Sequence, residues 1–308
     1  MNTSGPSRPA AKSLTARGKL FLVWAATVLV LLGMVAVAVV RTGPVPGSDF
    51  LAGPQEQWQD QWEEQPAADA PAAEAPKAAV DLDALDAEVR RILEENSGYR
   101  IGVVLADTHG GEPRGYGDGS EFVAASTAKI LTAAAYYHLV ETGEKSLDVP
   151  LGSYDAAFQL KAMVNASSND AWLLLMQDIG YPKLIEYAAS IGISYDPEQN
   201  LLTPAEMAEL LKQLSTGKLI NAEHTQELLG YMQQTNNERL IPAAVGPDIT
   251  VQHKYGELGG YVHDAALLSS GERSYALAIY TWGEDGESEA RLAVIHSLAD
   301  VVARSLRE

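Results

Sequence analysis

A serine and a lysine three positions apart, Ser126 and Lys129, open a long apolar segment that runs to Gly143. Residues three apart lie on one face of a helix, so the lysine amine is expected to reach the serine hydroxyl. The segment is apolar nearly all round, which is typical of a helix buried on every side. Burial disfavours the charged form of a lysine, and a neutral amine beside a serine can activate it as a nucleophile.

The same spacing occurs at Ser215 and Lys218, where Gly217 lies between the two residues and no long apolar helix follows. A single pair of this kind is therefore weak evidence for catalysis. The case for Ser126 depends on whether the chain supplies the other groups that such chemistry needs.

Two further polar motifs follow in the chain. Ser167-Ser168-Asn169 falls in a predicted loop between two helices, and Lys254-Tyr255-Gly256 is predicted to end a strand and lead into a turn. With Ser126 and Lys129, they match in order and setting the Ser-x-x-Lys, Ser-Asp-Asn and Lys-Thr-Gly motifs of class A β-lactamases and penicillin-binding proteins. Each motif alone is common, whereas all three in order are not.

From about Asp81 to its end, the chain therefore resembles the class A β-lactamase-like serine hydrolases. Residues 252–267 look like the family's strand pair beside the active site, and residues 203–211 look like one of its helices. The resemblance implies an α+β fold in which a mostly antiparallel five-stranded sheet is flanked by helices and joined by an all-helical subdomain. We expect no cofactor, and the six histidines show no metal-ligand spacing.

The resemblance also implies a role for each motif residue. Ser126 would attack a carbonyl and carry the acyl group, and Lys129 would accept the serine proton directly or through a water. Ser167 would relay a proton to the leaving nitrogen, with Lys254 polarising its hydroxyl. The oxyanion would meet the backbone N–H groups of Ser126 and Glu257. The expected substrate-binding residues are Asn169, which would also hold Lys129, and Tyr255, Gly256 and Glu257.

The sequence departs from the family pattern at the third motif. Tyr255 replaces a threonine or serine whose small hydroxyl binds the substrate carboxylate in the family. Glu257 adds a negative side chain at the edge of the cleft, which is unfavourable for an anionic β-lactam. In the second motif Ser168 stands where the family has aspartate, a position whose neighbours carry the chemistry.

A second departure concerns the base for deacylation. Class A β-lactamases place a glutamate on a loop with a Trp-Glu-Pro-x-x-Asn-like sequence, and residues 195–200 resemble that loop with Asp196 in the glutamate's place. The next helix begins already at about Thr203, so the loop looks truncated. Either Asp196 or Glu198 could serve as the base, and the alternative is a solvated turn.

The hydrophobic pattern predicts the remaining elements. One helix is expected from Asp81 to about Gly98, two strands at Arg100–Thr108 and 112–117, and a helix capped by Ser153 that reaches about Asn165. Later segments are expected as helices over 172–179, 182–191, 203–214, 221–234 and 291–306, and as strands over 249–254, 260–268 and 275–282.

The amino-terminal part has a different character. Leu20 to Val40 is a run of 21 uncharged residues preceded by basic groups, which predicts a transmembrane anchor (20–40) behind a cytoplasmic tail (1–19). A cleavable signal ending near Ala36-Val-Ala38 is the alternative. Residues 41–80 are a Pro-, Ala- and acid-rich stretch that predicts a disordered linker to the hydrolase domain at 81–308.

Composition narrows the functions further. The chain has no cysteine and a formal net charge of −19, which argues against nucleic-acid binding and excludes thiol chemistry. We expect a monomeric, single-pass membrane protein of a bacterium with an extracytoplasmic serine hydrolase domain. Its substrate would be a small-molecule β-lactam or, alternatively, a cell-wall peptide or ester. A catalytically idle domain that binds wall material is the third hypothesis.

Overall fold

The computed structural model describes residues 82–284 and 288–307. Its centre is a five-stranded sheet in the order β2-β1-β9-β8-β7, in which every neighbouring pair is antiparallel. The predicted antiparallel five-stranded sheet is therefore confirmed. The strands are β1 (Arg100–Asp107), β2 (Arg114–Gly117), β7 (Thr250–Leu258), β8 (Tyr261–Ser270) and β9 (Arg273–Trp282).

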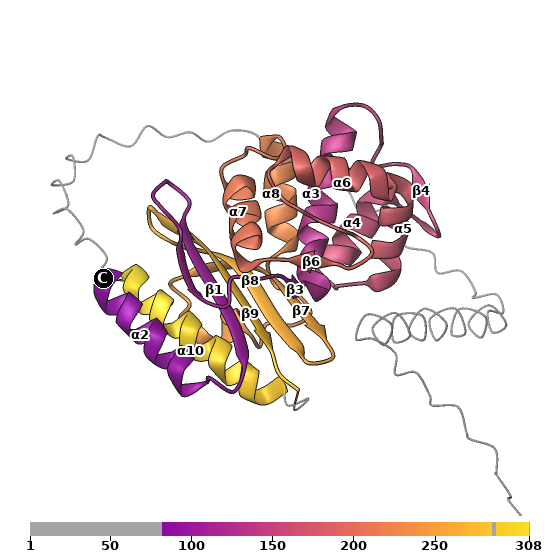
Figure 1. Ribbon diagram of the computed structural model, residues 1–308. Coiled ribbons are helices and arrows are strands. Elements are labelled where there is room, and N and C mark those ends of the chain that lie inside the picture. The colour runs from indigo at the N-terminus through magenta and orange to yellow at the C-terminus, as the bar shows by residue number, and fades with distance from the viewer. Residues whose placement is uncertain (1–81, 285–287, 308) are drawn as a thin grey trace, which may run out of the picture. The chain divides into compact units, whose positions relative to one another are not determined.

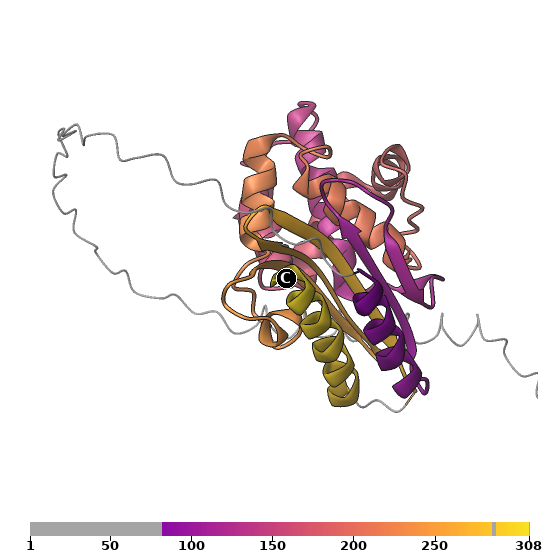
Figure 2. The ribbon, with the colours of Figure 1, turned by 90° about the vertical axis from the view of Figure 1, so that its left-hand side faces the viewer.

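Both faces of the sheet are covered by helices. Successive side chains of a strand point to opposite faces, and the strands carry apolar side chains on both. In β9, Leu277 and Ile279 pack with α2 (Leu82–Glu95) and α10 (Ser288–Arg307), whereas Ala278 and Tyr280 belong to the core on the other face. Figure 1 shows α2 and α10 on one side of the sheet and the helices between residues 129 and 231 on the other. Figure 2 shows the same layering from a second direction.

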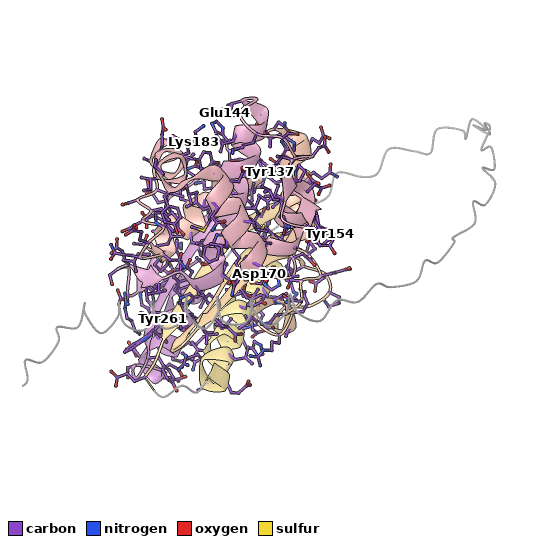
Figure 3. The ribbon with its side chains drawn as sticks, turned by 90° about the vertical axis from the view of Figure 1, so that its right-hand side faces the viewer. Tyr137, Glu144, Tyr154, Asp170, Lys183 and Tyr261 are labelled. Atoms are coloured by element: carbon purple, nitrogen blue, oxygen red, sulfur yellow. The ribbon has the colours of Figure 1, made fainter. Side chains whose placement is uncertain are left out.

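The helices on the second face form one block around α3, which carries no polar face and is buried along most of its length. Lys183 and Glu144 form an exposed ion pair at the end of the block far from the sheet (Figure 3). The block consists of α3 (Lys129–Glu141), α4 (Ala156–Val164), α5 (Asn169–Ile179), α6 (Tyr181–Ser190), α7 (Pro204–Ser215) and α8 (Ala222–Tyr231).

Local capping explains where these helices begin. Thr203 and Glu206 form the predicted capping box of α7, and Asn221 caps α8 as its position suggested. The prediction that Ser153 caps α4 is wrong. Asp155 accepts the N–H of Phe158 in its place, because Tyr154 and Asp155 pair with Pro150 and Leu151 in a small hairpin of β4 (Pro150–Leu151) and β5 (Tyr154–Asp155).

Two connections matter for the site. β7 does not end at Lys254 as predicted but continues to Leu258, which still pairs with Tyr261 of β8. The loop after α6 contains β6 (Leu201–Leu202), which pairs with β3 (Phe122–Val123). A short helix, α9 (Ile241–Ala244), was not predicted and leads into β7.

The predicted tail, transmembrane anchor and linker, at 1–19, 20–40 and 41–80, lie outside the described residues. Within the described part of the chain, no helix is long and apolar enough to cross a membrane. The anchor and its topology therefore stay predictions.

The core of the helical block yields a first prediction. Leu211 on α7 is fully buried in that core, so Leu211→Ala is expected to lower the free energy of unfolding by about 2–5 kcal/mol through lost burial and a residual cavity. Leu173→Ala is the matched control, since Leu173 is 54% exposed and should change stability by less than about 0.5 kcal/mol. Urea unfolding measures both, and equal effects would contradict the described core.

Candidate active site

Ser126 lies in a tight turn between the sheet and the helical block. The turn is a 3₁₀ helix, η1 (Ala125–Ala128), which runs directly into α3 at Lys129. The residue before the serine, Ala125, has φ +50°, a left-handed conformation that L-residues avoid. Such strain persists where the surroundings enforce it, and it often marks a functional site.

The surroundings that enforce this turn are buried hydrogen bonds. Asn200 donates its Nδ2–H to the carbonyl of Ala125 at 3.0 Å and accepts the N–H of Ala124 on its own carbonyl at 2.8 Å. Thr127 donates to the carbonyl of Ala124 at 2.7 Å and lies 2.7 Å from the Tyr280 hydroxyl. The loop after α6 and strand β9 thus hold the serine-bearing turn from two sides.

The Lys129 side chain crosses the gap to the second motif. Its Nζ lies 2.7 Å from the Ser167 carbonyl, 2.8 Å from Asn169 Oδ1 and 3.3 Å from Ser167 Oγ. The expected lysine contact to Ser126 is thus replaced by contacts to residues 38 and 40 positions away in sequence. Burial lowers the pKa of Lys129 to about 7, so a large fraction of this amine is neutral near neutral pH.

Ser167 is the point where two lysines meet. Its hydroxyl accepts a hydrogen bond from Lys254 Nζ at 2.9 Å and lies 3.3 Å from Lys129 Nζ. Like Ala125, Ser167 is in the left-handed region, with φ +55°, and it precedes the α5 cap Ser168. This conformation turns both its carbonyl and its hydroxyl toward the lysines.

Lys254 lies on strand β7 and is fully buried in the same site. Burial and the nearby Lys129 lower its pKa to about 7, whereas Asp264 acts in the opposite direction. Two amines that share one hydroxyl are unfavourable when both are charged, because their repulsion is poorly screened in a buried site. The site therefore favours states in which at least one lysine is neutral.

The edge of the sheet supplies the remaining groups. β7 is an edge strand, and the N–H of His253 points away from the sheet to the Met232 carbonyl at 2.8 Å. Because N–H groups two residues apart point the same way, the N–H of Glu257 faces this outer edge too. A Cβ on Gly256 would lie only 2.9 Å from the Ser126 nitrogen, so β7 passes against the serine turn. This places two backbone donors near the serine.

Tyr255 and Glu257 lie at the rim of this arrangement. The Tyr255 ring centroid is 4.0 Å from Lys254 Nζ, and its hydroxyl donates to Asn236 Oδ1 at 3.0 Å. Glu257 Oε1 accepts from Asn237 Nδ2 at 3.3 Å and lies 3.5 Å from an Arg239 nitrogen.

The two candidate deacylation bases, Asp196 and Glu198, make no direct hydrogen bond to Lys129 in the described chain. The Asp196 carboxylate accepts the N–H of Glu198 at 2.8 Å and the Gln199 amide at 2.6 Å, and the Gln199 bond lowers its pKa. The Glu198 side chain is exposed.

Several residues with a part in the site were not singled out from sequence. Asn236 joins Tyr255 to the loop before Ser167, and nothing in its polar surroundings distinguishes it from Asn237. His253, directly before Lys254, is fully buried and binds Asp264 through Nδ1 at 2.9 Å, and Asp264 raises its pKa. Asn200 was signalled by the Asp-Pro-x-x-Asn pattern of its loop.

Comparison with known proteins agrees with this geometry. Residues 84–306 match the β-lactamase enzyme family. The chain belongs to this family. Among characterised relatives, β-lactamase CTX-M-8 of Citrobacter amalonaticus is 26% identical over 250 residues, covering 68% of this chain and 85% of the relative.

Solved structures show the same fold. An ancestral class A β-lactamase superimposes with a TM-score of 0.65 and 25% identity, covering 72% of this chain and 99% of that protein. PBP-A, as its acyl-enzyme complex with penicillin G, gives a TM-score of 0.66 at 20% identity and covers 75% and 99%. The protein is thus a serine hydrolase of the class A β-lactamase type, as the motifs predicted.

The close passage of β7 gives a second prediction. Gly256→Ala is expected to lower the second-order rate constant of acylation about 100-fold or more, because the added methyl pushes the strand and its N–H donor away from Ser126. The measurement is stopped-flow acylation by a chromogenic cephalosporin. Gly115→Ala on β2 is the control, since a Cβ there meets no atom within 4 Å. An unaltered rate for Gly256→Ala would contradict the described approach.

Proposed function

We propose that the protein forms an acyl-enzyme at Ser126 by attack on an amide or ester carbonyl, with the β-lactam ring amide as the family's substrate. The observation that carries this proposal is the convergence of Lys129 and Lys254 on the Ser167 hydroxyl. This network lies beside the serine turn, because β7 carries both Lys254 and Gly256, the residue that touches Ser126.

The proton of Ser126 passes to Lys129 in this proposal. A neutral amine has two N–H groups and one lone pair, and the two shortest contacts of Lys129 go to acceptors, the Ser167 carbonyl and Asn169 Oδ1. Its lone pair is thus left for a hydroxyl proton, directly or through a water. As the tetrahedral intermediate forms, the N–H groups of Ser126 and Glu257 bind its oxyanion.

The leaving group receives its proton from Ser167. As the C–N or C–O bond of the tetrahedral intermediate breaks, the Ser167 hydroxyl gives its proton to the departing atom and is reprotonated from the lysine pair. Lys254 stabilises the developing negative charge on Ser167 Oγ through their 2.9 Å hydrogen bond. The acyl group then stays on Ser126 until water removes it.

Hydrolysis of the acyl-enzyme is the slow step in this proposal. The Asp196 carboxylate is occupied by Glu198 and Gln199 in its own turn, so it does not prepare a water at the acyl group. This observation favours the second candidate function, a penicillin-binding-type hydrolase of cell-wall peptides or esters with a long-lived acyl-enzyme. We propose for either function that the domain acts outside the cytoplasmic membrane on the predicted anchor.

A fluorescent penicillin tests the proposal. We expect covalent labelling of the full chain, a mass increase equal to one probe, and a labelled peptide that contains Ser126. Ser126→Ala should abolish labelling, because its side chain has no nucleophile, and Ser215→Ala should leave it unchanged. Label lost over hours indicates slow hydrolysis, and label lost within seconds indicates an efficient β-lactamase. Equal labelling of Ser126→Ala would overturn the assignment.

The lysine pKa values predict the pH dependence of acylation. Below pH 7 Lys129 is mostly protonated and has no lone pair, and above pH 7 it is mostly neutral. The acylation rate should therefore rise roughly tenfold per pH unit below about 7, and above about 7 it should fall as Lys254 loses the proton with which it stabilises Ser167 Oγ. Rapid-quench labelling between pH 5 and 9 measures this profile, with hydrolysis of the free probe subtracted. A rate that falls as the pH rises from 5 to 7 would contradict Lys129 as the base.

A further inference from the structure

The ring of Tyr255 lies over the amine of Lys254. The ring centroid lies 4.0 Å from Nζ, a distance at which an ammonium group is attracted to the face of an aromatic ring. The same Nζ donates to Ser167 Oγ at 2.9 Å and to the Tyr255 carbonyl at 3.0 Å. An ammonium has three N–H groups, and these three partners occupy them. The side chain of Lys254 thus has no N–H left for a substrate anion.

Tyr255 is held in this position by a chain of hydrogen bonds. Its hydroxyl donates to Asn236 Oδ1 at 3.0 Å, and Asn236 Nδ2 donates to the Ala166 carbonyl at 2.9 Å. The N–H of Asn236 also donates to the Asn165 carbonyl at 3.2 Å. The bridge therefore runs from β7 to the loop that carries Ser167. It fixes the ring over Lys254.

The charged residues at the rim of the site also disfavour a substrate carboxylate. Glu257, two residues after Tyr255 on the same outer edge of β7, interacts with Arg239 at 3.5 Å. Arg239 also binds Glu289 at 3.0 Å, so one guanidinium is shared between two carboxylates. The net negative charge of this group repels a substrate carboxylate.

We propose that the site selects acyl donors whose leaving group carries no carboxylate. Tyr255 is the residue that determines this selectivity. The leaving part of the substrate is neutral or cationic, as in an amide or ester inside a longer chain. This inference rests on the proposed acylation of Ser126. It also implies that β-lactams, which carry a carboxylate, acylate Ser126 only at high concentration.

Two thioesters that differ in one group test the selectivity. In one, the leaving thiol carries a carboxylate, and in the other that carboxylate is a primary amide. The full chain is mixed with each, thiol release is followed by absorbance, and the Ser126 adduct is identified by mass spectrometry. We expect the wild type to react with the amide at least about tenfold faster in second-order rate constant, since the carboxylate has no donor and meets like charge.

Three variants assign the effect to the ring. Tyr255→Thr removes the cover from Lys254 and offers a small hydroxyl, so its amide-to-carboxylate ratio should fall to about one or below. Tyr255→Phe keeps the ring and should keep most of the preference. Tyr154→Thr is the matched control, because Tyr154 is 56% exposed on the helical block (Figure 3), and it should keep the wild-type ratio.

The outcomes separate this inference from the proposed function. Equal or faster reaction of the wild type with the carboxylate thioester, with an adduct on Ser126, overturns the selectivity but leaves the acyl-enzyme standing. An unchanged ratio in folded Tyr255→Thr removes Tyr255 as its determinant. If neither thioester forms a Ser126 adduct, the proposed function fails and the selectivity fails with it. The wild-type ratio does not depend on any variant folding.

Discussion

The site depends on two buried lysine amines that share one serine hydroxyl. Water hydrates an ammonium group strongly, so burying even one is costly, and burying two within reach of Ser167 adds their repulsion. The protein offsets part of this cost with polar partners: the Ser167 carbonyl and Asn169 for Lys129, and the Tyr255 carbonyl and ring for Lys254. The remaining cost appears as the lowered pKa of both lysines, and a base that is neutral near pH 7 is what the chemistry needs.

The lysines can meet only because three segments far apart in sequence are held together. Lys129 begins the buried helix α3, Ser167 lies in the strained loop before α5, and Lys254 lies on β7. None of these segments could hold its conformation alone. Ala125 and Ser167 both lie in the left-handed region, and their strain is offset by buried hydrogen bonds to Asn200 and Lys129. Tertiary contacts thus stabilise the unfavourable backbone conformations of Ala125 and Ser167.

Many elements of the fold and the motif residues of the site could be predicted from the sequence, because they depend on patterns within short segments. The spacing of Ser126 and Lys129, the polar interruption at Ser167, and the alternation that marks the strands all follow from short-range periodicity. The α7 capping box was predicted correctly from such local signals, and the five-stranded sheet from the family resemblance that the motifs carry.

The parts that the sequence did not reveal depend on long-range contacts. Gly256 was interpreted as the start of a turn, since glycine usually interrupts a strand. In the structure the strand continues, and glycine is needed because the backbone of the serine turn passes too close for a side chain. The partner of Tyr255 at Asn236 likewise depends on residues that only folding brings together, whereas the contact of Lys129 with Asn169 was implied by the family resemblance.

The loop from Asp196 to Asn200 shows how one scaffold can separate two steps of a reaction. Asn200 supports the proposed acylation, because its amide holds the turn that carries Ser126. Asp196 stabilises the loop itself, since its carboxylate accepts the N–H of Glu198 and the amide of Gln199. A carboxylate committed to its own turn can support the geometry for forming an acyl-enzyme without supplying a base to remove the acyl group. In the proposed reaction the loop therefore supports formation of the acyl-enzyme through Asn200 without supplying a base for its hydrolysis.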